Sequence, residues 1–230
     1  IDGISYVNFN GSGDIAGTLG TPECDVTVCR QNSSAVTWTG EVAGVGIEQQ
    51  YAIADGGVYI IMTTTLTNNT LTDINNLYWF RNGDPDNSQP TTGSYSTNNT
   101  IVSQPDATIE LASVKAEGGD GATLYLMSSD SRARVTHGGF NNNDAEQIWN
   151  GTGLNKTVGF TSSADQAISL AYKFNTILPG EYVSFRTIYA LSPTAVTAAV
   201  NCAEVPVGPA DTDNDTILDE NDNCIDVQNI

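Results

Sequence analysis

The residues best suited to chemistry lie near the C-terminal end of the sequence, in the acidic segment 211–222. An EF-hand-type calcium loop takes its oxygen ligands from positions 1, 3, 5, 7, 9 and 12, with a backbone carbonyl at position 7. The predicted ligands on this spacing are Asp211, Asp213, Asp215, Ile217 (through its carbonyl), Asp219 and Asp222. Thr216 replaces the usual glycine and Asp222 is shorter than the usual Glu, so the sequence predicts a weakened Ca²⁺ site. The alternative is a solvated acidic tail.

With Asn223 and Cys224 added, this segment closely resembles a thrombospondin type 3 repeat. Repeats of that family wrap around calcium ions, and disulfides tie neighbouring turns together. The resemblance implies that the five aspartates bind calcium. Because such repeats normally occur in tandem, the natural protein is expected to continue beyond Ile230.

The preceding residues carry a second, looser resemblance. It rests on residues 178–181 and 82–86, and it is to the β-sandwich domains that precede such repeats in bacterial secreted and adhesin-type surface proteins. It implies an extracellular β-sandwich whose role is binding.

Two further loops concentrate oxygen ligands. Residues 82–87 include Asp84 and Asp86, which predict either a second calcium site or an ordinary Asx/Pro turn. Residues 141–144 are similar and are more typical of a polar loop. The aromatic residues form a candidate sugar-stacking platform, with Trp149 expected to be the better exposed and one of the adjacent Tyr78 and Trp79 expected in the core. The candidates are Tyr78, Trp79, Tyr95, Phe140 and Trp149.

Catalysis finds little support in the sequence. His137 is the only histidine and is better interpreted as a structural residue than as a base. Acidic residues are so abundant that no pair stands out as a glycosidase pair. No nucleophile-elbow, zinc-protease or phosphate-loop motif occurs. The sequence therefore predicts a protein that is not an enzyme.

The amino-acid composition limits the cellular compartment and the classes of partner that are expected for the protein. The four cysteines, Cys24, Cys29, Cys202 and Cys224, lack zinc-site spacing, so disulfides in an oxidising compartment are expected, with three pairings possible. Eight basic against 27 acidic residues leave a net charge of −19, which disfavours nucleic acid and anionic membrane surfaces. No apolar run approaches the roughly 20 residues of a membrane-spanning helix. A start at Ile1 is consistent with a mature secreted product whose leader has been removed.

The elements that must position these residues are short strands. Apolar and β-branched patterns predict strands at residues 58–66, 77–80, 108–114, 122–128, 133–136, 167–174 and 182–191. Turns are predicted at residues 118–121 and 178–181, and a strand or helical turn is predicted at residues 195–200. The glycines at positions 11, 13, 17 and 20 are predicted to lie in loops. No long amphipathic helix is predicted. The expected fold is an all-β antiparallel sandwich, jelly-roll or immunoglobulin-like, over residues 1–205, followed by a linker at 206–210 and the calcium-binding repeat at 211–230.

Three functions fit these features. The first is a non-enzymatic, extracellular, calcium-binding surface module for adhesion, with a protein, peptide or glycan ligand at a cell surface. The second is a structural subunit of a calcium-dependent surface filament or layer, which requires self-association. The third is an accessory or catalytic domain of a secreted polysaccharide hydrolase.

Overall fold

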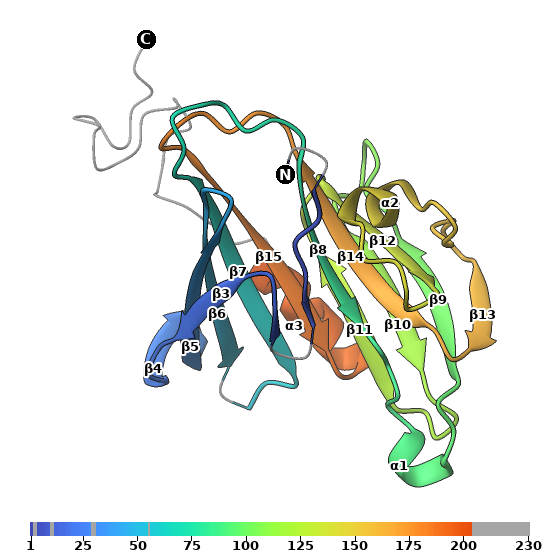
Figure 1. Ribbon diagram of the computed structural model, residues 1–230. Coiled ribbons are helices and arrows are strands. Elements are labelled where there is room, and N and C mark those ends of the chain that lie inside the picture. Colours follow the sequence, from blue (N-terminus) through green and yellow to red (C-terminus); the bar gives the residue numbers. More distant parts are fainter. Residues whose placement is uncertain (2–3, 10–11, 29–30, 55, 204–230) are drawn as a thin grey trace.

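The computed structural model describes residues 1–203 except 2–3, 10–11, 29–30 and 55, and over these residues the chain is an antiparallel, sandwich-like all-β fold (Figure 1). The predicted linker at 206–210, the calcium loop at 211–222 and Cys224 lie outside the described residues. The larger sheet runs in the order β13 (Thr161–Ala164), β9 (Thr97–Ser103), β10 (Ala112–Glu117), β11 (Thr123–Ser128), β15 (Tyr182–Ala190), β7 (Tyr59–Asn68), β6 (Val45–Ala54), β5 (Gln31–Val42) and β3 (Ala16–Leu19), with β4 (Glu23–Val28) also paired to β5.

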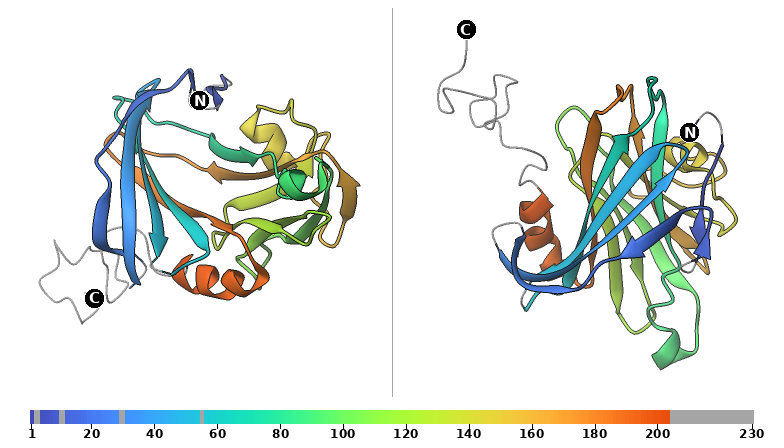
Figure 2. Two further views of the ribbon diagram at one scale, coloured as in Figure 1. Left: turned by 90° about the horizontal axis from the view of Figure 1, so that it is seen from below. Right: turned by 60° about the vertical axis from the view of Figure 1, so that its left-hand side comes forward.

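The second layer is a smaller sheet. It runs in the order β12 (Ala133–Gly138), β14 (Ala167–Phe174) and β8 (Leu77–Gly83), and it packs on β9, β10 and β11 of the larger sheet. The larger sheet curves away from it toward β5, β6 and β7 (Figure 2). A two-stranded ribbon of β1 (Asn8–Phe9) and β2 (Ser12–Gly13) precedes the large sheet.

Three short helices complete the described residues: α1 (Gln89–Thr92), α2 (Ala145–Asn150) and α3 (Pro193–Ala203). Helix α2 contacts all three strands of the smaller sheet. Residues 195–200, for which the sequence left a strand or a helical turn open, form part of α3. No helix in the described residues is both long and apolar enough to cross a membrane.

The core lies between the two sheets, where apolar side chains of both inner faces meet. Its centre is a cluster of three buried aromatic rings, Tyr172 and Phe174 from β14 and Phe185 from β15. The Tyr172 and Phe185 ring centroids are 4.2 Å apart, and the Tyr172 hydroxyl donates to the carbonyl of Arg186 at 2.7 Å. Burial of such rings contributes about 1.5–3 kcal/mol each, so this cluster holds the layers together where the smaller sheet covers the larger one.

Most predicted strands are confirmed, with shifts at their ends. The strand predicted at 108–114 begins only at Ala112, and the strand predicted at 77–80 continues to Gly83 as β8. The turns at 118–121 and 178–181 are confirmed, the latter closed by a hydrogen bond from Glu181 N to Leu178 O of 3.0 Å. The prediction that Gly13 and Gly17 lie in loops was wrong, since Gly13 pairs with Asn8 in the β1–β2 ribbon and Gly17 pairs with Gly40 in the β3–β5 ladder. Cys24 is exposed in β4, and because Cys29 and Cys224 lie outside the described residues, disulfide formation stays a prediction.

Candidate functional site

A cleft of about 1610 Å³ opens where the large sheet curves away from β8. The inner face of β5 and β6 lines one side, β8 lines the other, and the N-terminal segment borders it. Sites for drug-sized ligands occupy about 300–1,000 Å³, so this cleft has room for a longer ligand. Its aromatic lining consists of Tyr6, Trp38, Tyr51, Tyr78, Trp79, Phe80 and Phe140.

Trp38 lies flat against the large sheet in the floor of this cleft. The reason is that two glycines face each other beneath it, Gly17 on β3 and Gly40 on β5. A Cβ atom at Gly17 would stand 2.1 Å from the indole, and one at Gly40 would stand 2.4 Å from it. Trp38 is half-buried and lines the cleft, so its indole presents its other side to a ligand. The glycine pair therefore builds an aromatic platform into the sheet.

Polar groups run beside the platform as one hydrogen-bonded chain. Gln49 lies directly opposite Trp38 in the β5–β6 register and is only 5% exposed. Its amide donates to Thr64 Oγ1 at 3.2 Å, and its Oε1 accepts from the Tyr51 hydroxyl at 3.2 Å. The Tyr51 oxygen in turn accepts from Arg81 Nη2 at 2.8 Å. These bonds hold an amide, a phenol and a guanidinium in place along the cleft.

Strand β8 carries the opposite wall. Leu77, Trp79 and Arg81 pair with Phe174, Tyr172 and Leu170 of β14, so all three point toward the sandwich interior. Trp79 packs edge-on against Phe185 at 6.2 Å. The Trp79 Nε1 and Arg81 Nε atoms are both buried without a hydrogen-bond partner in the described residues. Buried donors without acceptors are unusual in proteins and call for a specific explanation.

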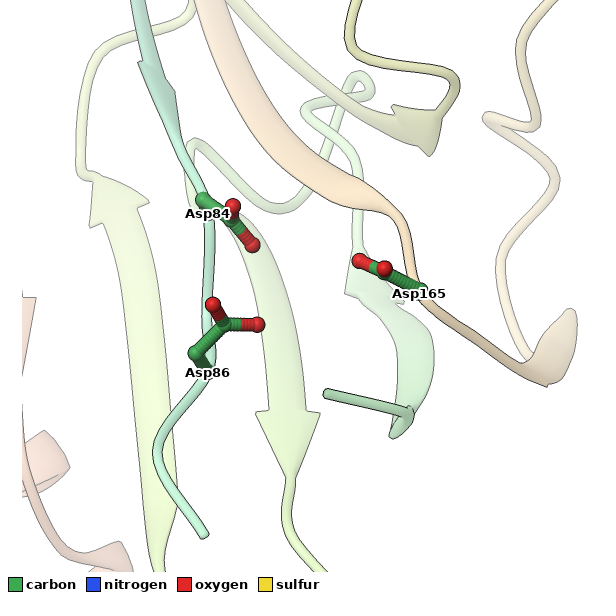
Figure 3. Close-up of side chains that lie close together, drawn as sticks. All are labelled: Asp84, Asp86 and Asp165. Atoms are coloured by element: carbon green, nitrogen blue, oxygen red, sulfur yellow. The ribbon is translucent and has the colours of Figure 1, made fainter. Parts of the chain in front are cut away.

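Three carboxylates meet at the end of β8. Asp84 and Asp86 follow β8, and Asp165 lies in the turn between β13 and β14, where pairing of Gly83 with Ile168 brings the two segments together (Figure 3). One oxygen from each residue lies within 4.8 Å of the others, so the three could hold a metal ion. Asp84 also lines the cleft.

The charges of this cluster perturb one another. Burial raises the pKa of Asp84 first, and the neighbouring charge and hydrogen bond of Asp86 and the charge of Asp165 raise it further. The Asp86 Oδ1 atom is buried and has no hydrogen-bond partner in the described part of the chain. A bound cation would relieve this repulsion by favouring the ionised forms of all three groups.

The structure tests only part of the predicted metal ligation. Asp84 and Asp86, the weaker sequence candidate, come together with Asp165, which the sequence analysis did not single out. No local signal marks Asp165, because strand pairing alone brings it to Asp84. The stronger candidates lie outside the described residues: Asp211, Asp213, Asp215, Ile217, Asp219 and Asp222.

The aromatic candidates separate into three groups. Tyr78 and Trp79 face opposite sides of β8 as expected, and Phe140 joins them in the cleft lining. The expectation that Trp149 is well exposed was wrong, since its Nε1 donates to Arg132 O at 2.9 Å and its ring packs against Tyr78 at 6.4 Å. Tyr95 is 52% exposed but does not line the cleft. Sequence reasoning missed Trp38, whose glycine support depends on the pairing of β3 with β5.

His137 is a structural residue, as the sequence indicated. It is fully buried, with Nδ1 at 3.2 Å from Gln166 Oε1 and its ring stacked on Phe160 at 5.7 Å. In the loop at 141–144, the carboxylate of Asp144 accepts from Glu146 N and Gln147 N and so caps α2. Both residues are engaged in holding the fold.

No family model matches the chain. No curated protein matches it in sequence.

Several solved structures match the chain in shape. A protein described as an aldose 1-epimerase from Klebsiella pneumoniae subsp. pneumoniae has 10% identity and a TM-score of 0.31, over 74% of this chain and 54% of its own. A GH36 alpha-galactosidase from Geobacillus stearothermophilus has 11% identity and a TM-score of 0.32, over 82% of this chain and 29% of its own. This chain thus spans about half of the first protein and under a third of the second. At such TM-scores these likenesses carry no argument about function.

Proposed function

We propose that the protein is a non-enzymatic, extracellular module that binds a glycan in the cleft between its two sheets and uses calcium to stiffen the cleft's edge. The observation that carries the proposal is the Trp38 platform over Gly17 and Gly40. A sugar ring has a face of C–H groups and a rim of hydroxyls. An aromatic ring held flat stacks on the face, and neighbouring polar side chains bond to the rim.

The polar chain next to Trp38 supports this choice of ligand over an apolar one. Gln49, Tyr51 and Arg81 offer an amide, a phenol and a guanidinium along one side of the platform. The amide and the phenol can both donate and accept hydrogen bonds, and the guanidinium donates them, as recognition of hydroxyl groups requires. A purely apolar ligand would desolvate these groups without offering an acceptor to the unpartnered Arg81 Nε, at a cost of about 1–3 kcal/mol.

Calcium is the metal that we assign to Asp84, Asp86 and Asp165. Three carboxylates from two segments supply hard oxygen ligands without nitrogen or sulfur, which favours calcium or magnesium. Calcium tolerates the irregular geometry of a site shared by two loops better than magnesium does. The acidic composition and the thrombospondin type 3-like segment support the same ion and an extracellular location.

Replacing Trp38 with Ala tests the glycan proposal. Wild-type protein and variant are screened on an oligosaccharide array, and each ligand found is then titrated by calorimetry. We expect the variant to bind its ligand at least about tenfold more weakly, which corresponds to about 1.4 kcal/mol. Tyr95→Ala, which removes an exposed aromatic ring outside the cleft, is the matched control and should bind as the wild type does. Equal affinity in the Trp38 variant, or no glycan bound by the wild type, would contradict the proposal.

The polysaccharide hydrolase is the second candidate, and one observation favours it. Asp84 lines the cleft, and its pKa is raised, as that of a general acid should be. Incubating the identified glycan with wild type and Asp84→Asn and measuring new reducing ends would decide the matter. Cleavage that disappears in the variant would make the protein an enzyme.

A further inference from the structure

We propose that the glycan is acidic: Arg81 binds a sugar carboxylate, so the ligand class is a uronate-bearing oligosaccharide. This inference rests on the glycan-binding function proposed above and adds the ligand's charge. It concerns Arg81, whose guanidinium lines the cleft on the inner side of β8.

Among the described residues, Arg81 has no carboxylate partner although the protein is strongly acidic. The chain has 27 acidic and only 8 basic residues. Among the described residues, the ion pairs are Lys115 with Glu117 and Arg132 with Asp130, and neither involves Arg81. The hydrogen bond that its guanidinium makes there runs from Nη2 to the neutral Tyr51 hydroxyl, and its Nε has no partner. A partly buried cation kept without a counter-ion is costly, so a negatively charged ligand would complete the site.

The surroundings hold the Arg81 guanidinium in position. Its carbon lies 5.8 Å from the centre of the Tyr51 ring and 6.0 Å from that of Trp79. Such rings attract a cation without neutralising it. A guanidinium fixed in this way keeps the planar fork of N–H groups that matches the two oxygens of a carboxylate.

Arg81 lines the same cleft as Trp38, so one oligosaccharide can contact both. Trp38 is directly opposite Gln49, and Tyr51 is two residues further along β6 on the same face. Such diagonal neighbours are about 7–8 Å apart, and Tyr51 bonds directly to Arg81. The Trp38 indole extends the other way along β5, over Gly40, so a further sugar of the same oligosaccharide would bring its carboxylate to the guanidinium.

The other charged residues lining the cleft are engaged elsewhere. Lys173 pairs with Tyr78 on the opposite face of the smaller sheet, and Glu146 Oε1 accepts from the Tyr78 hydroxyl at 3.3 Å. Asp144 caps α2, and Asp84 belongs to the carboxylate cluster. Within the described part of the inner wall, Arg81 is thus a cation without a carboxylate partner beside an aromatic platform.

The test compares oligomers that differ only in charge. Uronic-acid hexamers of several sugar types and the same hexamers with methyl-esterified carboxylates are titrated into the full chain by calorimetry. We expect the wild type to bind at least one free acid tenfold or more tightly than its ester, with the difference shrinking at higher salt. Arg81→Gln should bring the ratio of free-acid affinity to ester affinity close to one, because glutamine is uncharged. Arg81→Lys keeps the positive charge but loses the planar fork of N–H groups. It should therefore keep only part of the affinity difference between acid and ester.

Each other outcome separates the two proposals. Equal binding of acid and ester, or preference for neutral glycans, would overturn the acidic-ligand inference and leave glycan binding intact. A preference that persists in Arg81→Gln but disappears with EDTA would assign it to the carboxylate cluster instead, which also overturns the role of Arg81. If no glycan of either kind binds, the proposed function itself fails. Thermal unfolding of both variants checks that they fold as the wild type does.

Discussion

His137 illustrates how burial changes the behaviour of a single ionisable residue. Its ring is fully buried, and its Nε2 has no hydrogen-bond partner in the described residues. Burial is the main cause that lowers the pKa of His137, with the Gln166 hydrogen bond opposing it. The folded state therefore resists protonation of the ring, whereas the unfolded chain accepts a proton near pH 6.5.

This difference predicts acid sensitivity with a definite sign. Because the folded pKa lies below the unfolded one, the free energy of unfolding is largest above about pH 6.5 and falls as the pH drops below that value. The slope cannot exceed about 1.4 kcal/mol per pH unit for one group. Urea unfolding between pH 7.5 and 5.5 should show the fall in wild type and much less of it in His137→Gln. Since His137 is the only histidine, an equal fall in both proteins would show that other groups cause it.

At the scale of elements, the pairing of β3 with β5 decides whether Trp38 can serve as a platform. The ladder places Gly17 opposite Gly40, and the indole occupies the space that their missing side chains leave. A strand with ordinary side chains at these positions would force the indole off the sheet. The platform is thus a property of two paired strands, and Trp38 alone does not specify it.

Gly40→Ala tests this arrangement without removing the tryptophan. The new methyl group would lie 2.4 Å from the Trp38 ring and 2.6 Å from the Ala16 carbonyl oxygen, so the ring must move. We expect about a tenfold loss of glycan affinity and a red-shifted tryptophan emission, with a stability cost of about 1–3 kcal/mol. Gly139→Ala, where no atom lies within 4 Å of the added methyl, is the control. Unchanged emission and affinity in Gly40→Ala would show that the ring does not depend on the glycine pair.

At the scale of the whole molecule, calcium has two candidate places with different consequences. One is the cluster of Asp84, Asp86 and Asp165, which joins the end of β8 to the β13–β14 turn. The other is the sequence motif at 211–222, outside the described residues. Binding in the cluster stabilises the sandwich, whereas binding in the motif protects only the segment that follows it.

Two substitutions separate these effects. For a site with a dissociation constant near 1 mM, 10 mM calcium adds about 1.4 kcal/mol, or roughly 3–6 °C in a domain of this size. Asp165→Asn should abolish the thermal gain of the sandwich and leave calcium-dependent protection of the C-terminal segment from protease. Asp213→Ala should abolish the protease protection of the C-terminal segment and leave the thermal gain of the sandwich. Glu48→Gln, which changes an exposed acid on β6, should change neither the thermal gain nor the protection. A thermal gain that survives in Asp165→Asn would place the stabilising ion outside the cluster.

The sequence by itself determined the fold class and most of the strands that are regular and well buried. The strand predicted at 167–174 is β14, and the one at 58–66 is most of β7, because their apolar and β-branched residues continue over a whole strand. It did not indicate β5 or β6, whose many Ser, Thr, Gln and Gly residues resemble loops. These strands form because neighbouring strands satisfy their backbone groups along ten paired positions.

In the candidate site, too, local sequence predicted some features and only the tertiary structure decided the others. Local spacing marked Asp84 and Asp86 as candidate oxygen ligands and Tyr78 and Trp79 as a pair facing opposite sides, since both inferences need only nearby residues. Only the tertiary structure decided that Asp165 joins the aspartates and that Trp38 rests on Gly17. These contacts depend on the register between strands far apart in the chain. That register is set by the packing of two whole sheets, and no short stretch of sequence contains it.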